Sequence, residues 1–599
     1  MISKFNTAAA AILAVSLVAL SANASDPAAA AKKHSVSKTH KEKMPPAPTV
    51  EEQIQALRQE MQGQINGLKT SLAEKDAELQ SAKQAAADAQ ASAAKAEAAA
   101  SSSNQAIVDN TTAVTTLQST VTDLKGNQTS LAATVSDETA NMKKEIASPE
   151  ALHYKGITIS PAGSFLAAES VNRTGATGGG LNTALTGIPL QSSDAAQLSE
   201  FQGSGRQSRL AIKAVGKLDS MALTGYYELD WLGTGITSNN NQSNSYVMRQ
   251  RQIWGQAALN SGWTFTGGQM WSLATETTKG LSNGSEILPG TIDPQYTAGF
   301  VWTRQYGFRV SKEFSKKFFL GASAESAETL NPGGSGLPTN VLIGSTGTGG
   351  GLYNSTANYS FNLAPDFVAK MAFEPGWGHW EVFGIGRFFR DRIYPNATAS
   401  TPSSLGAFND SAMGTGIGGG FRAPLGDKKV TIGLKGLWGK GMGRYGDSTI
   451  ADVTLNPYGS IEPLKSFSAL STLEAQVTPR FSLYANYGGD YVYRQYWGKA
   501  GYGNPLTNMS GCNTEPVTGG SFSPSTPSSC GGNNKDVQEA TFGYWYNFYS
   551  GPKGRLRQGI QYSNIRRDIW SGAGGTTNPG GGAHGDDNMV FTSFRYYLP

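Results

Sequence analysis

The spacing of apolar residues changes at about residue 150. Before that point, apolar residues return every three or four positions, which is the period of a helix with one apolar face. After it they alternate with polar residues. In residues 223–231 the odd positions are apolar, aromatic or glycine, and the even positions include Glu228 and Asp230. A period of two is typical of strands with one apolar and one wet face. The sequence therefore predicts a helical part followed by an all-β part.

About sixteen alternating segments follow one another in the second part. They lie near residues 154–168, 206–218, 221–232, 247–259, 263–271, 300–312, 317–326, 366–375, 379–390, 412–423, 428–440, 464–477, 480–493, 537–550, 555–569 and 588–598. Most are close to the length of about 9–11 residues that a tilted transmembrane strand needs, or slightly longer. Short turns such as Asp219–Ser220 alternate with long loops rich in Gly, Ser and Asn, a regularity that a soluble all-β array does not require. We therefore expect an all-β transmembrane barrel of about sixteen antiparallel strands over residues 150–599.

The first part predicts a long helix over residues 50–148, which contain no proline and end before Pro149. From residue 107 a heptad seam is present. One seam position holds Ile107, Val114, Val121, Val135 and Met142, with Gln128 among them, and the other holds Leu117, Leu124 and Leu131, with Asn110. Such a seam predicts an α-helical coiled coil ahead of the barrel. β-Branched residues with Leu favour two helices, but the polar seam residues weaken that rule and leave the number of helices open.

The N-terminus predicts export from the cytoplasm. Residues 1–24 combine Lys4, an apolar run of about thirteen residues and the small-residue motif Ala22-Asn23-Ala24, which is the pattern of a signal peptide. Residues 25–49, rich in Ala, Lys and Pro, predict a solvated linker. An alternative is that the lysines of this linker contact an anionic cell-wall polymer or the inner leaflet.

Composition excludes several classes of protein. Hydrophobic residues make up 39% of the 599, and no later segment has the ~20 apolar residues of a membrane helix. The 73 glycines and 10% aromatic residues fit strands better than disorder. A net charge of +4 gives no reason to expect a nucleic-acid partner. The two cysteines, Cys512 and Cys530, predict a loop disulfide in an exported chain, with a metal pair as the weaker alternative.

Two short motifs resemble a known family. The stretches Gly205-Arg206-Gln207-Ser208-Arg209-Leu210 and Gly268-Gln269-Met270-Trp271-Ser272 are similar to those of DcaP-like porins of Gram-negative outer membranes, a group related to the phosphate-selective porins. A coiled coil before a sixteen-strand barrel also fits these families. The resemblance implies a homotrimer, which favours three helices in the coiled coil, and diffusion of small, often anionic, organic solutes.

Strand parity assigns charged residues to the pore wall, since a charge on the lipid face would cost about 2–4 kcal/mol at the midplane. The residues assigned in this way are Arg209, Lys213, Glu228, Asp230, Arg309, Lys370, Lys435, Arg555, Arg557 and Arg595, with Glu374 and Glu474 as further inward acids. Cations outnumber acids, which predicts a mild preference for anions. An alternative is that the arginines are spread around the wall and pair with the acids.

Parity leaves three arginines uncertain and points to one loop. Arg249 and Arg251 share a face with an apolar residue, so their direction is undecided unless a bulge intervenes, and Arg304 lies on the apolar face, which suggests the outer rim. Residues 272–299, which include four charged side chains, are the best candidate for a loop that folds into the pore and narrows it. The alternative is a plain external loop.

No motif supports an enzyme. Gly280-Leu281-Ser282-Asn283-Gly284 matches G-x-S-x-G, but neither a strand before it nor a helix after it is predicted. The glycine-rich stretches lack the Lys-Ser/Thr of a phosphate loop, and the five histidines have no metal-binding spacing. We therefore expect no catalytic residue, no metal and no cofactor.

Together these patterns predict a porin in a bacterial outer membrane, with its coiled coil in the periplasm. Expected partners are outer-membrane lipid, two further copies of the chain, small anionic solutes and, through the N-terminal region, peptidoglycan. The main alternative is a structural stalked barrel that tethers or spaces the outer membrane against the cell wall. A trimeric surface adhesin is disfavoured, because sixteen strands are too many for a small anchoring barrel.

Overall fold

The computed structural model describes most of the second part of the chain. The described residues are 151–233, 247–331, 337–344, 359–427, 429–512, 515, 530–573 and 582–599, with helical residues 81, 84, 85, 88, 92, 118, 120–132, 134–136 and 139. The chain divides into two compact units, residues 1–81 and 82–599. The predicted signal peptide and basic linker lie outside the described residues.

The described positions before residue 150 are helical, as the three-to-four spacing predicts. Threonine hydroxyls at four of them, such as Thr122 and Thr129, donate to the carbonyl four residues earlier. Seam residues of this helix are exposed in the single chain: Val121 is 57% exposed and Leu131 45%. The helix is therefore present at these positions, and its association into a coiled coil stays a prediction. Over the described residues, no helix is long and apolar enough to cross a membrane.

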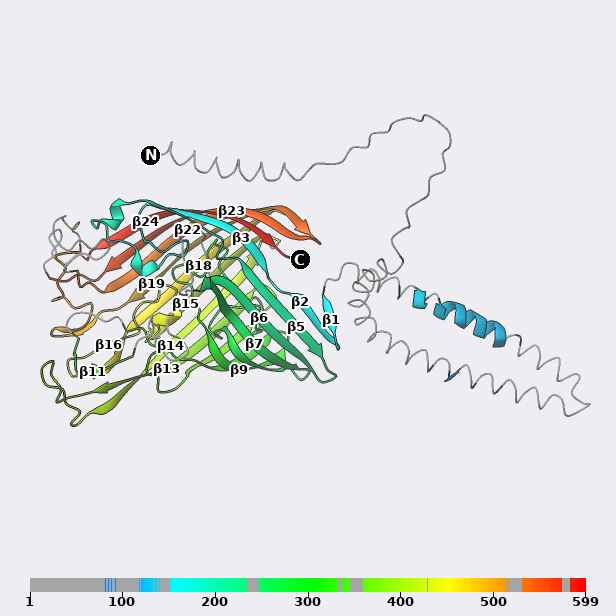
Figure 1. Ribbon diagram of the computed structural model, residues 1–599, viewed down its shortest axis with the longest axis horizontal. Helices are drawn as coiled ribbons and strands as arrows, with labels where there is room; N and C mark the ends of the chain where they lie inside the picture. The colour runs from blue at the N-terminus through cyan, green and yellow to red at the C-terminus, as the bar shows by residue number, and fades with distance from the viewer. Residues whose placement is uncertain are drawn as a thin grey trace, which may run out of the picture. The chain divides into compact units, whose positions relative to one another are not determined.

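Sixteen antiparallel strands form a closed barrel (Figure 1). The main sheet has 20 strand segments, of which β1 and β11 are short additions and two neighbouring pairs each form one long strand. The segments of the wall are β2 (Ile157–Pro161) with β3 (Phe165–Arg173), β4 (Glu200–Ser204) with β5 (Arg209–Lys217), β6 (Met221–Gly233), β7 (Val247–Leu259), β8 (Trp263–Trp271), β9 (Arg304–Ser315), β10 (Phe318–Glu325), β12 (Asp366–Phe373), β13 (His379–Ile393), β14 (Phe408–Leu425), β15 (Val430–Lys440), β18 (Lys465–Thr478), β19 (Phe481–Val492), β22 (Asn534–Gly551), β23 (Gly554–Ile569) and β24 (His584–Tyr597). Pairing of β24 with β3 closes the ring. The predicted strand number is therefore confirmed.

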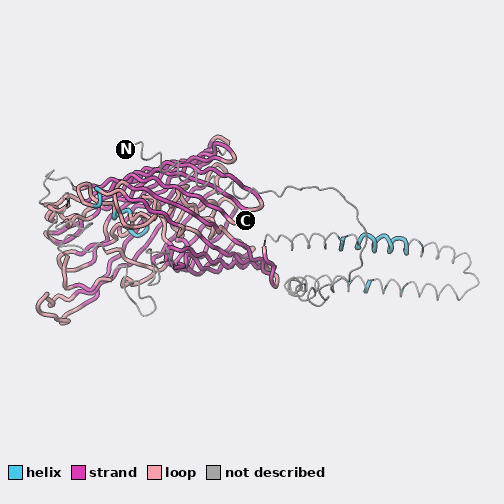
Figure 2. Tube along the Cα trace, turned by 45° about the horizontal axis from the view of Figure 1, so that its top comes forward, coloured by secondary structure: helices cyan, strands magenta, loops and turns pink. Residues whose placement is uncertain are grey.

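The smaller elements lie at the barrel ends. Segment β1 (Leu152–Tyr154) pairs with β2 as a hairpin, and β11 (Val341–Leu342) pairs with the end of β13. Two small hairpins stand in long loops: β16 (Val453–Leu455) with β17 (Ile461–Pro463), and β20 (Gln495–Trp497) with β21 (Ala500–Tyr502). Three 3₁₀ turns lie in the described part of the chain: η1 (Leu185–Gly187), η2 (Ala195–Gln197) and η3 (Gly443–Tyr445). Long loops gather at the end of the barrel opposite the β1–β2 hairpin (Figure 2).

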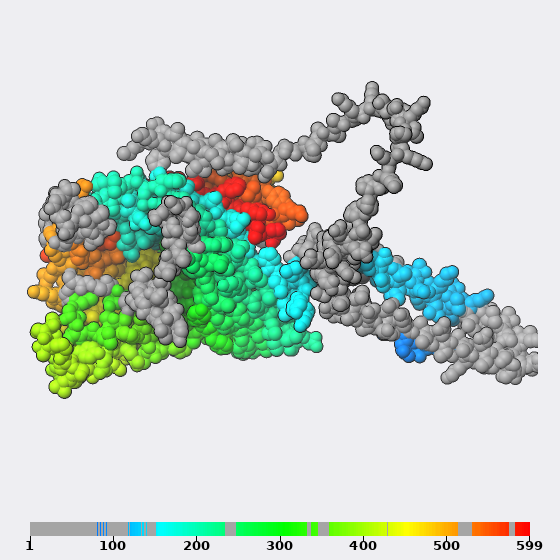
Figure 3. Space-filling view, viewed as in Figure 1, coloured from blue at the N-terminus to red at the C-terminus, as the bar shows by residue number. Residues whose placement is uncertain are grey.

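The strand faces show the alternation that the sequence predicts, with the usual soluble pattern reversed. Large apolar side chains such as Phe308, Phe367 and Trp438 point outward and are 50% or more exposed. Charged side chains of the same strands point inward, and Arg309 and Lys370 are 3% and 2% exposed. An apolar outer face and a charged interior are the pattern of a membrane barrel. Residues coloured green pack closely together on the face that the space-filling view shows (Figure 3).

A disulfide joins Cys512 and Cys530 in the long loop between β21 and β22, with sulfurs 2.09 Å apart. Cys512 is 1% exposed and packs with Leu190, Met509 and Ile569. The loop is therefore tied to itself and seated on an apolar cluster at the barrel end.

Candidate functional site

The segment 272–303, between β8 and β9, lies inside the barrel. Its first half is held to the wall by inward lysines: Lys435 Nζ donates to the carbonyl of Ala274 at 2.6 Å, and Lys370 Nζ to that of Thr275 at 2.8 Å. The amide of Gly280 donates to Glu374 Oε1 at 2.6 Å. This half therefore rests on strands β12 and β15 and on the turn between β12 and β13.

The two lysines are neutralised by one acid. Glu381 of β13 pairs with Lys370 and with Lys435, each at 2.5 Å, and all three side chains are 4% exposed or less. His379 bridges Glu381, at 3.1 Å, and Glu374, at 2.8 Å. Buried charges are tolerated where they are paired in this way. We call Lys370, Glu374, His379, Glu381 and Lys435 the latch cluster.

The second half of segment 272–303 meets the opposite wall. Three of its backbone amides donate to inward side chains there: Ile292 to Gln561 at 2.6 Å, Ala298 to Glu539 at 2.8 Å and Gly299 to Asp490 at 3.0 Å. Trp545 Nε1 of β22 donates to the carbonyl of Gly290 at 2.8 Å. The segment therefore crosses the interior from one wall to the other.

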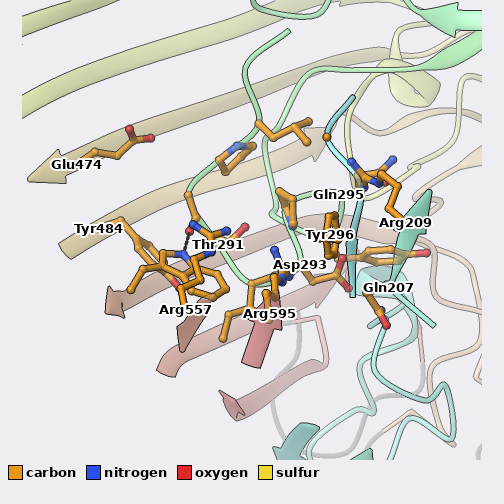
Figure 4. Close-up of a pocket in the computed structure, with 18 of the residues that line it drawn as sticks. Gln207, Arg209, Thr291, Asp293, Gln295, Tyr296, Glu474, Tyr484, Arg557 and Arg595 are labelled. Carbon is orange, nitrogen blue, oxygen red and sulfur yellow. Dashed lines mark hydrogen bonds between the residues drawn. The ribbon is translucent and has the colours of Figure 1, made fainter. Parts of the chain in front are cut away.

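A cavity of about 610 Å³ lies where this second half narrows the barrel (Figure 4). Its cationic lining residues are Arg209, Arg249, Arg251, Arg304, Lys429, Arg557 and Arg595. Its acidic lining residues are Asp230, Asp293 and Glu474. Figure 4 shows Thr291, Asp293 and Gln295 of the crossing segment between Arg209 on one side and Arg557 and Arg595 on the other. The cavity wall therefore carries an excess of positive charge.

A β-bulge turns Arg251 into the cavity. Glu228 is paired with Gln252 and the next residue, Leu229, with Gln250, so Arg251 is the extra residue of β7. Arg251 is 1% exposed, binds Asp230 at 2.7 Å and pairs with Glu228. It also donates to Gln295 of the crossing segment at 2.8 Å. The direction of Arg251, which parity leaves undecided, is thus settled by a local irregularity.

Neighbouring arginines share the same two acids. Arg249 forms a bidentate pair with Asp230, with bonds of 3.0 and 2.8 Å, and Arg209 lies 3.4 Å from Glu228. Three cations therefore share two carboxylates on this side of the cavity.

Arg304 adds a fourth cation on this side, and no ion pair to an acid joins it among the residues that the structure covers. It is the first residue of β9 and lines the cavity. Its Nε and Nη1 atoms are buried and have no hydrogen-bond partner there. The rings of Trp271 and Trp302 lie 5.4 and 5.9 Å from its guanidinium. The expectation that Arg304 lies at the outer rim is therefore wrong: at the end of a strand, a side chain is not bound by the strand's parity.

The opposite side holds two arginines of unequal surroundings. Arg595 of β24 is paired with Glu169 at 2.6 Å and donates to the carbonyl of Ile292. Arg557 of β23 stacks on the Trp545 ring at 3.7 Å and donates to the hydroxyl of Tyr597, with no carboxylate in its ion-pair shell over the described residues. Arg557 and Arg304 are thus the two arginines of the cavity whose charge is not offset by a paired acid.

Asp293 is the buried acid of the crossing segment. It is 7% exposed and accepts a hydrogen bond from Asn182 Nδ2 at 2.7 Å. Burial raises the pKa of the Asp293 carboxyl to about 7, and the nearby charge of Glu169 adds to the rise, although Arg595 opposes it. The charge of this acid therefore changes near neutral pH.

The structure separates the residues that parity grouped together. Five of them, Arg209, Asp230, Glu474, Arg557 and Arg595, line the cavity, and Glu228 sits directly behind it. Three others hold the first half of the crossing segment: Lys370, Lys435 and Arg309, whose guanidinium donates to the Asn283 side-chain carbonyl. Lys213 and Arg555 do not line the cavity; Lys213 is exposed, and Arg555 stacks on Tyr597 at 4.3 Å. Whether any of these residues controls solute passage stays a prediction.

Sequence reasoning missed part of the lining. Arg249, Arg251, Arg304 and Lys429 line the cavity without having been assigned there, as do the uncharged residues of the segment 288–296. The only signal for Arg251 was the conflict between its charge and its apolar neighbours, which a bulge resolves. In the described part of the chain, no group of three or more His, Cys, Asp or Glu residues could hold a metal ion.

Comparison with known proteins supports the fold. No protein-family model matches the chain, and no curated protein does. Among solved structures, the outer membrane channel DcaP of Acinetobacter baumannii is similar, with 15% identity, a TM-score of 0.50, and coverage of 75% of this chain and 99% of that chain. An anion-selective porin from Comamonas acidovorans matches at 10% identity, with a TM-score of 0.39 and coverage of 74% and 100%. OprB of Pseudomonas putida matches at 11%, with a TM-score of 0.38 and coverage of 77% and 97%. The resemblance to DcaP-like porins is thus confirmed at the level of the fold.

Proposed function

We propose that this barrel is an outer-membrane porin for the passive diffusion of small hydrophilic solutes, with a preference for anions. The observation that carries the proposal is the cavity beside the crossing segment, where Arg304 and Arg557 face the lumen and no acid of the described residues is paired with either. A barrel with an apolar outer face belongs in a membrane, and a charged interior narrowed by an inner loop is suited to sorting solutes by size and charge.

The charge of the cavity favours anions by simple counting. Seven cations and three acids line it, and the two acids directly behind it, Glu228 and Glu169, still leave two more cations than acids. In a narrow passage with low-dielectric walls, such an excess raises the local concentration of anions. Removal of one charge at ~7 Å in water changes the energy of a passing ion by about 0.6 kcal/mol, which is roughly a threefold change in concentration.

The helical part supports a trimeric assembly in the periplasm. The apolar seam that includes Val121, Leu124, Leu131 and Val135 is between 41% and 57% exposed in the single chain. Burial of such a seam against copies of itself is the driving force of a coiled coil. The resemblance to DcaP-like porins is the reason why we propose three copies and not two.

The test is conductance of the purified, detergent-folded protein in a planar bilayer, with a salt gradient that gives the reversal potential. We expect conductance in three equal steps and a reversal potential that shows chloride to be more permeant than potassium. Failure of a folded and inserted protein to conduct would contradict the porin proposal.

A matched pair of variants tests the role of Arg304. Arg304→Gln removes an unpaired charge from the cavity, which disfavours chloride and favours potassium by about 0.6 kcal/mol each, so we expect the ratio of chloride to potassium permeability to fall by up to roughly eightfold. Lys213→Gln removes an exposed inward charge that does not line the cavity, so its effect on the ratio should be smaller. Equal effects of the two substitutions would show that overall lumen charge, and not the cavity, sets the preference.

A further inference from the structure

A pair of aspartates lies inside the wall near the end of the barrel that carries the long loops. Asp391 of β13 and Asp410 of β14 are direct cross-strand partners. Asp391 is 2% exposed and shares its face with Phe389 and Ile393, which are each 1% exposed. Directly opposite residues of antiparallel strands have Cβ atoms about 5 Å apart. Two carboxyl groups therefore face each other at short range beneath the loops.

The described residues supply no cation for this pair. Both carboxyl oxygens of Asp391 are buried and have no hydrogen-bond partner there. Asp410 accepts one bond, from the amide of Ile461 at 3.0 Å. Arg390 and Arg392 alternate with Asp391 and so lie on the other face of β13, where Arg392 binds Asn409 at 2.9 Å. Like charges opposite each other, one of them buried without partners, disfavour the folded state unless something neutralises them.

We propose that Asp391 and Asp410 bind a divalent cation, with Ca²⁺ as the preferred ion. Ca²⁺ accepts carboxylate oxygens at about 2.3–2.6 Å in flexible geometry, so one ion can bridge two carboxylates that lie opposite each other. Asp410 is partly exposed, which gives water a route to complete the coordination shell. Mg²⁺ fits less well, because it demands a near-ideal octahedron of shorter bonds.

The affinity of such a site should be low. Two carboxylates are few for Ca²⁺, and the part of the chain that the structure covers holds no third acidic ligand in a metal-binding group with them. Sites with few charged ligands in extracellular proteins bind with dissociation constants of about 10⁻⁴–10⁻³ M. Such a weak site could be occupied only where Ca²⁺ is present at a concentration near its dissociation constant, as it is for extracellular proteins.

The bound ion would fasten a loop to the wall. Through the bond to Ile461, Asp410 already holds β17, part of the loop between β15 and β18. Ile461 packs with Phe389, Val453 and Leu455 in one apolar cluster at this end of the barrel. A cation between Asp391 and Asp410 would remove the repulsion under this loop and stabilise it. This inference does not depend on the selectivity of the pore.

The test uses the whole chain, refolded in detergent free of lipopolysaccharide, which itself binds divalent ions. Ca²⁺ binding is measured by calorimetry, and unfolding temperature is measured in Ca²⁺ and in a chelator. We expect binding in the millimolar range or tighter, and a rise of about 2 °C or more in the unfolding temperature with Ca²⁺. Asp391→Asn and Asp410→Asn should lose both effects. The control Asp586→Asn removes an exposed acid of β24 and should keep them.

Three results would overturn the proposal. The first is the absence of Ca²⁺ binding to the unaltered protein at several millimolar. The second is an equal Ca²⁺ effect in the Asp391→Asn, Asp410→Asn and Asp586→Asn proteins. The third is an unfolding temperature that is the same in Asp391→Asn as in the unaltered protein, both with Ca²⁺ and with chelator, which would mean that the pair holds a proton instead. If Asp391→Asn fails to refold, the partly exposed Asp410 gives the decisive variant.

Discussion

The two halves of the crossing segment meet the barrel through different electrostatics. The first half rests on the latch cluster, where two lysines share one glutamate and a histidine bridges two acids. The second half borders the cavity, where three arginines share two acids on one side, and where Arg304 on that side and Arg557 on the other have no paired acid among the described residues. The first arrangement is nearly neutral and buried, and the second leaves positive charge facing the lumen.

This difference shows that an inward direction does not define a role. Lys435 and Arg557 both point inward by strand parity. Lys435 forms an ion pair with Glu381 and donates a hydrogen bond to a backbone carbonyl, whereas Arg557 faces the cavity. A paired charge has a short-range field and mainly holds structure, while an unpaired one contributes to the potential that a solute meets. The presence or absence of a paired acid, and not strand parity, therefore distinguishes a structural charge from one that acts on a solute.

The largest effect should follow from breaking the latch cluster. Glu381→Gln leaves Lys370 and Lys435 buried without their common acid, and removal of one partner from buried ion pairs costs about 3–5 kcal/mol. We expect a lower free energy of unfolding, measured by urea titration of the protein in detergent, with the anion preference nearly unchanged in the molecules that fold.

The matched control for this prediction is Glu474→Gln. Glu474 pairs with Arg422 at 2.6 Å, but its side chain is 32% exposed, so loss of the pair should cost no more than about 1 kcal/mol. Equal losses of stability in the two variants would contradict the view that the latch cluster is a buried structural unit.

The sequence alone was sufficient to predict the sixteen-strand barrel, whereas the preference for anions stays a prediction. Residues such as Leu210 to Lys213 alternate between apolar and polar because each side chain must face either lipid or lumen. A charge on the lipid face has a high free-energy cost. The position of the crossing segment was also within reach, since a long loop with several charged residues interrupts the barrel pattern there. These features depend on local chemistry, which the sequence records directly.

Partner identity was beyond reach because it depends on contacts between residues far apart in the chain. The tie between Lys435 and Ala274 spans 161 positions, and that between Ala298 and Glu539 spans 241. Parity also fails at strand ends and at irregularities, as Arg304 and the bulged Arg251 show. The sequence therefore failed to predict part of the cavity lining, where a bulge and a loop set the direction of the side chains.

A substitution at Arg251 should change both the stability of the protein and the selectivity of the pore. Arg251 pairs with Glu228 and Asp230 and also holds Gln295 of the crossing segment. Arg251→Gln removes a buried cation but leaves Arg209 and Arg249 beside the two acids, so we expect a moderate loss of stability, about 2–3 kcal/mol. The same change should lower chloride preference, because the cavity loses one positive charge.

Urea unfolding and reversal potential measured on the same Arg251→Gln protein test both parts. Arg209→Gln is the comparison, since its contact with Glu228 is longer, at 3.4 Å, and should matter less for stability. A change in stability with unaltered selectivity would show that Arg251 has a structural role, like the latch cluster, and does not contribute to anion preference.

The smallest effect should come from a proton. Because burial raises the pKa of Asp293 to about 7, this carboxyl is largely neutral at pH 6 and largely ionised at pH 8. The cavity therefore gains up to one positive unit as pH falls through this range, and the ratio of chloride to potassium permeability should rise by up to roughly eightfold. In Asp293→Asn the acid is absent, so the preference for chloride should stay at the level of the low-pH state across the same range.

Reversal potentials of both proteins at pH 6, 7 and 8 test this prediction. We expect the reversal potential to depend on pH in the unaltered chain only. A pH dependence that persists in Asp293→Asn would assign the titration to another group, and a preference that falls as pH falls would show that the cavity does not govern selectivity.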